Sequence, residues 1–238
     1  LLIQDGRSRE EISFKDRLLS LIFTKNLFLR ILNKVQYWVE KHLFSQFATV
    51  NKVEIINCLN QIELIKLTPT RKGFLDIFST KDSEIVKGYD LDVILRHEFN
   101  IIRGDILGSS KYGIWSFHHA DNDVIRGGPP GFWEIILKKS NIGITLQELT
   151  PELDGGLVID KAYTNISYSY SKNRYQILED SVALLFKNLK NLKNNEYKPV
   201  KSKTYSDILY KSPDLAVTIR YMVNFYIIYF ATLIRRIR

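Results

Sequence analysis

Hydrophobic and polar positions along this chain follow two different periods. A period of two residues, or a short continuous apolar run, predicts strands at residues 1–6, 62–67, 89–95, 114–118 and 143–149. A helical period predicts helices near residues 51–60, 132–138 and 215–234. Because strands and helices take turns along the first two thirds of the chain, we predict an α/β fold with an open, doubly wound and mostly parallel sheet.

The first residues indicate that the sheet is incomplete. The chain begins without a methionine, and residues 1–6 have the pattern of a strand that ends in a turn. We therefore expect the first strand and helix of the sheet to be missing. Residues 13–47 follow with an apolar helical pattern interrupted by lysine and arginine, so they either pack within the domain, which is the simpler account, or face a membrane or partner. They contain no charge-free span of about twenty residues, so no transmembrane helix is expected there.

The positive charge is concentrated in the last third of the chain. The net charge is +8 over 238 residues, but residues 161–238 alone contain 14 basic and 5 acidic residues. Residues 188–203 have the composition of a basic linker, and residues 215–234 form an aromatic-rich apolar helix that ends in Arg235 and Arg236. Such a helix can contact an anionic membrane or a polyanionic substrate, or it can pack as a terminal helix. The single cysteine, Cys58, rules out an internal disulfide and favours the cytoplasm.

Candidate chemistry is concentrated in residues 111–161. In the strand at 114–118, Ser116 and His118 lie on one face, while Trp115, Phe117 and His119 point the other way. A glycine- and proline-rich loop at 126–131 follows, and Asp154 lies on an Asp-Gly-Gly turn after the strand at 143–149. Their joint order predicts one active site that contains Ser116, His118 and Asp154.

Each of these features has a simpler reading when it stands alone. A single strand histidine is more often a packing residue than a catalyst, and Asp-Gly-Gly by itself is a turn. His119, Asp121, Asn122 and Asp123 could suggest a metal site, but the two adjacent histidines face opposite sides of a strand, and hydrated loop residues explain the rest. We therefore expect no metal.

The ordered motifs resemble those of the folate-dependent formyltransferases, which include methionyl-tRNA, glycinamide ribonucleotide and sugar N-formyltransferases. That family has Asn-x-His on a strand, a Pro/Arg/Gly-rich loop, a Gly-Val-Thr strand and an Asp-x-Gly turn. Here the same order appears as 116–118, 126–130, 143–145 and 154–156, with Ser116 at the asparagine position. The resemblance extends over residues 85–165 and is absent after about residue 170.

The resemblance implies a role for each residue at a matching position. His118 is the second donor and proton shuttle, Asp154 is the carboxylate that orients it, and Ser116 is an altered oxyanion donor. The stretch after the strand at 89–95, read as a loop and short helix, is expected to contact the pterin of 10-formyltetrahydrofolate. The implied folate contacts are His97, Phe99, Asn100, Ile101, Ile102 and Glu152.

The implied function is formyl transfer from 10-formyltetrahydrofolate to an amine, with an amino sugar or sugar nucleotide as acceptor. The alternative is a catalytically impaired binding or accessory protein, because Ser116 replaces the family asparagine. A tRNA acceptor is not expected, since residues 161–238 lack the short successive strands of a barrel-like tRNA-binding domain. We predict a catalytic domain at 1–165, a mainly helical, basic extension at 166–238, and a cytoplasmic protein that can be peripheral to the inner membrane face.

Overall fold

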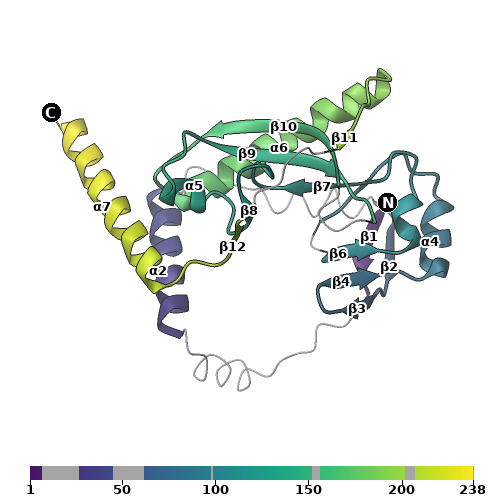
Figure 1. Cartoon of the computed structure of the whole chain (residues 1–238), viewed down its shortest axis with the longest axis horizontal. Coiled ribbons are helices and arrows are strands. Elements are labelled where there is room, and N and C mark those ends of the chain that lie inside the picture. Colours follow the sequence, from purple (N-terminus) through teal and green to yellow (C-terminus); the bar gives the residue numbers. More distant parts are fainter. Residues whose placement is uncertain (7–26, 45–61, 98, 152–155, 202–206, 238) are drawn as a thin grey trace.

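The computed structural model of the chain describes residues 1–6, 27–44, 62–97, 99–151, 156–201 and 207–237 (Figure 1). The predicted helix at 51–60 lies outside these residues. The largest sheet has five strands in the order β11-β10-β9-β7-β5, and only β5 and β7 run parallel. Its strands are β5 (Ile94–Leu95), β7 (Ile114–His118), β9 (Asn141–Glu148), β10 (Leu157–Asn165) and β11 (Val200–Lys201).

The remaining described strands form three smaller sheets. β1 (Leu2–Asp5) pairs in parallel with β2 (Leu64–Leu67), and β8 (Arg126–Gly127) does so with β12 (Leu209–Tyr210). The third sheet has the order β3-β4-β6 and mixes both directions; its strands are β3 (Thr70–Lys72), β4 (Leu75–Ile77) and β6 (Ile101–Arg103).

The mixed α/β class is as predicted, but the single open and mostly parallel sheet is not confirmed. β9 and β10 are joined by residues 149–156, and β9 pairs antiparallel with both neighbours. A parallel crossover needs about a dozen residues or more, so this short connection allows only antiparallel pairing. Residues 99–107, predicted as a loop and a short helix, end in a short 3-10 helix at Asp105–Gly108, but the predicted loop contains strand β6.

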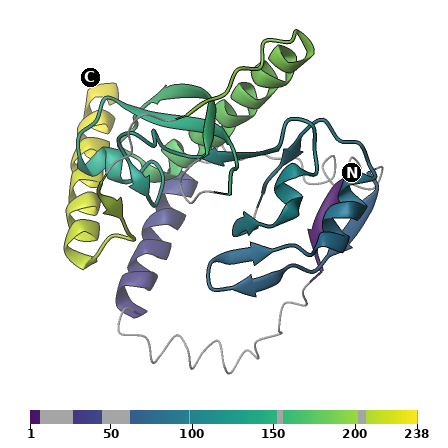
Figure 2. The ribbon, with the colours of Figure 1, turned by 45° about the vertical axis from the view of Figure 1, so that its right-hand side comes forward.

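The helices occupy separate parts of the molecule (Figures 1 and 2). α4 (Thr80–Lys87) lies with the sheets β1-β2 and β3-β4-β6 at one end, whereas α2 (Leu27–Leu43) and α7 (Leu215–Ile237) lie side by side at the other. The short α5 (Trp133–Ile136) follows the glycine- and proline-rich loop, as predicted. α6 (Tyr170–Lys193) lies along β9 and β10, with Ser169 as its N-cap.

One apolar core joins α6 to the five-stranded sheet. Trp115, Ile144 and Leu146 from the strands are buried together with Leu184 and Leu192 from α6. This packing extends the helix to Lys193, so the basic linker predicted at 188–203 is wrong over residues 188–193. Residues on both sides of the predicted boundary at 165/166 therefore share a core. The boundary itself stays a prediction.

The helix α7 has one buried and one exposed face. Tyr221 and Phe225 are 3% and 1% exposed and pack with Phe132. The outward face is apolar, with side chains that are 41–63% exposed: Leu215, Ile219, Val223, Ile227, Phe230 and Ile234. Residues Leu215–Arg236 are also long and apolar enough to cross a membrane by length and composition, with 17% of the most apolar window buried. The helix therefore has an apolar surface that the other described residues do not cover.

A buried carboxylate connects α2, α6 and α7. Glu40 of α2 is 1% exposed and accepts hydrogen bonds from the Ser169 hydroxyl at 2.7 Å, the Ser171 N–H at 2.9 Å and the Tyr221 hydroxyl at 2.5 Å. Two of these donors belong to the N-terminus of α6, where the helix dipole favours a negative charge. Tyr221 also accepts from the Tyr170 N–H at 2.8 Å, and burial and the neighbouring Glu40 raise the pKa of its phenol. One carboxylate thus holds three helices in place.

We expect Tyr221→Phe to lower the free energy of unfolding by about 1–2 kcal/mol, because it leaves Glu40 and the Tyr170 N–H each without one buried partner. Urea or thermal unfolding measures the change. Tyr226→Phe is the matched control, since Tyr226 packs in the same cluster and its hydroxyl bonds no other described residue. Equal effects of the two substitutions would contradict the role of the Glu40 contacts.

Candidate active site

Strand β7 presents Ser116 and His118 on the sheet face that points away from α6. The opposite face carries Trp115, which has no exposed surface and donates its ring N–H to the Tyr112 carbonyl at 3.0 Å. Antiparallel pairing with β9 places Thr145 beside His118, and pairing with β10 places Lys161 beside Thr145. The predicted face of the strand is therefore correct, and it continues as a row of polar side chains across three strands.

The contacts of His118 assign its neutral tautomer. The Nε2 atom lies 3.1 Å from the carbonyl oxygen of Ile125, which can only accept a hydrogen bond. Nε2 therefore carries the proton, and Nδ1 is the nitrogen with a lone pair. His119 stacks on Phe117 with 5.7 Å between ring centroids. Burial lowers the pKa of His119, and the nearby His118, His97 and Arg174 lower it further, so His119 is neutral at pH 7.

Arg96 contacts Ser116, and the sequence patterns gave no indication of this pair. The residue follows β5 directly, and its N–H bonds the Trp115 carbonyl at 2.8 Å, so the parallel register places it beside Ser116. Its Nη1 donates to the Ser116 hydroxyl at 2.8 Å and its Nε to the Phe99 carbonyl at 2.9 Å. Burial lowers the pKa of Arg96 and the nearby Asp76 raises it in part. The guanidinium remains charged at neutral pH.

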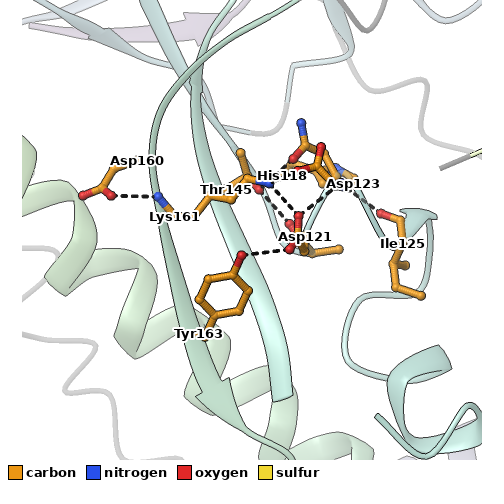
Figure 3. Close-up of polar contacts among 10 residues, drawn as sticks. His118, Asp121, Asp123, Ile125, Thr145, Asp160, Lys161 and Tyr163 are labelled. Atoms are coloured by element: carbon orange, nitrogen blue, oxygen red, sulfur yellow. Dashed lines mark hydrogen bonds and ion pairs between the residues drawn. The ribbon is translucent and has the colours of Figure 1, made fainter. Parts of the chain in front are cut away.

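The loop after β7 is held by Lys161 and Tyr163 of β10 (Figure 3). The Lys161 ammonium pairs with Asp121 at 2.6 Å and with Asp123 at 2.7 Å, and the Tyr163 hydroxyl donates to Asp121 at 2.9 Å. The view of these residues as hydrated loop side chains needs correction, because the Asp121 side chain is only 13% exposed. Burial lowers the pKa of Lys161, but the hydrogen bonds to both aspartates outweigh it, so the pKa is raised.

The Gly-Ile-Thr motif has a packing explanation in this structure. A Cβ atom added at Gly143 would lie 2.5 Å from the Cβ of Asp121 and 2.6 Å from its N atom, which only a glycine avoids. The hydroxyl of Thr145 donates to the Ala120 carbonyl at 3.0 Å. These two residues therefore fix the loop at 119–125 against β9, and that loop contains the carbonyl that binds His118.

Five of the six implied folate contacts lie in or next to the sheet β3-β4-β6. Phe99 packs on Phe78, and the Asn100 N–H donates to Asp76 at 2.9 Å. Ile101 and Ile102 belong to β6, and the Ile102 side chain is 4% exposed within a core cluster. His97 precedes this stretch and accepts the Phe99 N–H at its carbonyl, at 2.9 Å. The Arg96 bond to Phe99 thus links this stretch to Ser116.

Two predicted site residues, Asp154 and Glu152, lie outside the described residues, so their roles stay predictions. Within the part of the chain that the structure describes, no group of three or more His, Cys, Asp or Glu side chains is arranged to hold a metal ion. The described site consists of a hydroxyl, an imidazole and a guanidinium on one sheet face. This set can donate hydrogen bonds to an oxygen that gains negative charge and can accept a proton.

We expect Lys161→Met to lower the free energy of unfolding by about 1–2 kcal/mol, because two partly buried carboxylates lose their cation. Lys187→Met is the control: that lysine is 61% exposed and pairs with Asp160 alone among the described residues, so its loss costs at most about 0.5 kcal/mol. Since the folded pKa of Lys161 is raised, its contribution is complete below the ordinary lysine pKa of 10.5 and is lost as pH rises through the folded value. An effect of Lys161→Met that stays constant through that range would contradict the ion pairs.

Comparisons with known proteins agree with the motifs, although no protein-family model matches the chain. A methionyl-tRNA formyltransferase from Bacillus subtilis is 32% identical over 88 residues, which cover 37% of this chain and 28% of that protein. Among solved structures, a sugar N-formyltransferase from a Shewanella species aligns with 84% of this chain and 85% of its own, at 16% identity and a TM-score of 0.49. HypX from Aquifex aeolicus, in complex with tetrahydrofolic acid, aligns with 71% of this chain and 30% of its own, at 17% identity and a TM-score of 0.47. The match to the Bacillus protein confirms that this chain resembles the folate-dependent formyltransferase family.

Proposed function

We propose that this chain transfers a formyl group from 10-formyltetrahydrofolate to an amine. The observation that carries the proposal is the placement of Ser116 and His118 on one face of β7, followed along the chain by the loop and the Gly-Ile-Thr strand in the order typical of formyltransferases. The sequence match to the Bacillus enzyme supports it. Because that match spans 28% of the enzyme, the reaction is a proposal for this chain.

The reaction needs a proton acceptor and donors to an oxyanion. The amine nitrogen attacks the formyl carbon and forms a C–N bond, the carbonyl oxygen gains negative charge, and the bond to N10 of the folate then breaks. His118 can take the proton from the amine at Nδ1, since its Nε2–H is held by the Ile125 carbonyl, and can return it to N10. Both ring nitrogens of His118 therefore have partners in this step, so in this proposal Asp154 relays a proton through water and does not bond the imidazole. The stretch that contains His97, Phe99, Asn100, Ile101 and Ile102 binds the pterin with Glu152.

We infer an amino sugar or a sugar nucleotide as the acceptor. The described part of the C-terminal region consists mainly of α6 and α7, with two-residue strands β11 and β12, and this arrangement does not favour a tRNA-binding barrel. The second candidate function is a binding or accessory protein with impaired catalysis. That candidate is favoured by Ser116, whose hydroxyl is shorter than the asparagine amide of the family.

We also propose that α7 attaches the protein to the surface of an anionic membrane. Its exposed apolar face and the arginines Arg235 and Arg236 in its last turn support this contact, because basic residues next to an apolar face attract anionic lipids. The attachment would place a cytoplasmic enzyme at the inner membrane face.

We expect His118→Gln to abolish formyl transfer, because glutamine cannot accept a proton from the amine at neutral pH. The measurement follows the formation of tetrahydrofolate from 10-formyltetrahydrofolate in the presence of a panel of amines, including amino sugars and sugar nucleotides. His119→Gln is the matched control and should keep most of the activity, since His119 stacks on Phe117. Binding of the folate without transfer to any amine would instead favour the accessory protein.

For the membrane contact, we expect co-sedimentation with vesicles that contain anionic lipid and release as salt is raised, because charged contacts are screened. The double substitution Arg235→Gln and Arg236→Gln should weaken the binding by roughly thirtyfold, at about 1 kcal/mol per basic residue near the surface. Binding that depends on neither lipid charge nor salt would contradict an anionic surface as the partner.

A further inference from the structure

The site contains a cation that the resemblance to formyltransferases does not explain. Ser116 is 2% exposed and stands where the family has an asparagine, so the amide N–H that would face the formyl oxygen is missing. The neighbouring atom is instead Nη1 of Arg96, at 2.8 Å from the serine hydroxyl. A guanidinium has five N–H donors, and Arg96 uses one for Ser116 and one for Phe99. No other described residue accepts from Arg96, so the remaining donors are available to a ligand.

We propose that Arg96 donates a hydrogen bond to the formyl oxygen during transfer and thereby takes the place of the missing asparagine amide. This inference rests on the proposed formyltransferase function. Ser116 then has a different role from the one expected: its oxygen accepts from Arg96 and holds the guanidinium, and its own hydrogen remains a second donor.

The position of Arg96 is fixed by the backbone and not by the side chain alone. The residue continues the parallel register of β5 and β7, in which Ile94 pairs with Ile114 and Leu95 with Trp115. Its side chain therefore lies on the same sheet face as Ser116, two residues along β7 from His118. The bond to the Phe99 carbonyl holds the other side of the guanidinium. A donor held from two sides needs little rearrangement when the charge develops.

The charge balance around Arg96 also favours an anion at this place. Among the residues that the structure describes, no carboxylate lies within ion-pair distance of Arg96. The nearby Asp76 is instead bonded by Arg71 at 3.2 Å and by the Asn100 N–H at 2.9 Å. With no close anion among the described residues, this partly buried cation stabilises an oxygen that becomes negative. In the step itself, the electron pair of the C=O bond moves to this oxygen as the amine attacks, and returns as the bond to N10 breaks.

The test combines turnover with a spectroscopic measurement on bound ligand. Arg96→Gln should reduce kcat by about 10²–10³-fold, the typical cost of one oxyanion donor. With a formylated folate labelled with ¹³C at the formyl carbon, the infrared carbonyl stretch should lie at lower frequency in the wild-type complex than in Arg96→Gln, because a cationic donor weakens the C=O bond. Compared with Arg96→Gln, Arg96→Lys should recover part of the frequency shift, since lysine keeps the positive charge but lacks the planar, forked set of N–H donors.

Two controls separate catalysis from structure. Lys187→Gln removes a cation that is 61% exposed on α6, the helix on the other face of the sheet, and it should change neither kcat nor the carbonyl frequency. In a Ser116→Asn background, Arg96→Gln should cost less than about tenfold in kcat, because the new amide supplies a donor. Thermal unfolding of each variant identifies any loss that comes from misfolding.

The outcomes distinguish the two proposals. If the wild-type protein neither binds a formylated folate nor transfers the formyl group, the proposed function fails. If it does both, and folded Arg96→Gln keeps kcat within about twofold and the same carbonyl frequency, only the role of Arg96 is overturned.

Discussion

Hydrogen bonding along both edges of β7 is the constraint on which the rest of this structure depends. The strand runs parallel to β5 on one side and antiparallel to β9 on the other. Because side chains alternate along a strand, a shift of one residue in either pairing would turn Ser116 and His118 into the core and Trp115 out of it. The complete burial of Trp115 against α6 makes that shift costly. The core on one face therefore fixes the chemistry on the other.

The polar contacts of the molecule connect segments that are far apart in the sequence. Glu40 of α2 bonds residues at the start of α6 and in α7, and Lys161 of β10 bonds the loop after β7. In both cases a buried or partly buried charge finds its partners only after the strands and helices have packed. Such contacts select one arrangement of the elements, because a buried charge without its partners is strongly unfavourable.

Local patterns predicted the strands at 114–118 and 143–149 and the face on which Ser116 and His118 lie, because the period of two residues is a property of the strand itself. The pattern did not reveal Arg96, since its contact with Ser116 needs the parallel pairing of β5 and β7 in one register. It also missed Lys161, whose partners Asp121 and Asp123 lie 40 and 38 residues earlier. The patterns also missed strand β10 itself, whose antiparallel direction follows from the connection at 149–156, because that connection is too short for a parallel crossover.

The packing of Trp115 gives the protein an optical reporter beside the site. The indole has no exposed surface and stacks on Tyr197 with ring centroids 5.7 Å apart, one residue away from Ser116. Trp38 on α2 is 60% exposed and is surrounded largely by solvent. Fluorescence from a buried indole lies at shorter wavelength than fluorescence from an indole in water. The third tryptophan, Trp133 of α5, is half-buried. Once Trp133 is replaced by phenylalanine, the two remaining rings report on different places in one emission spectrum, and a shift in the short-wavelength part registers a change at the strand that carries Ser116 and His118.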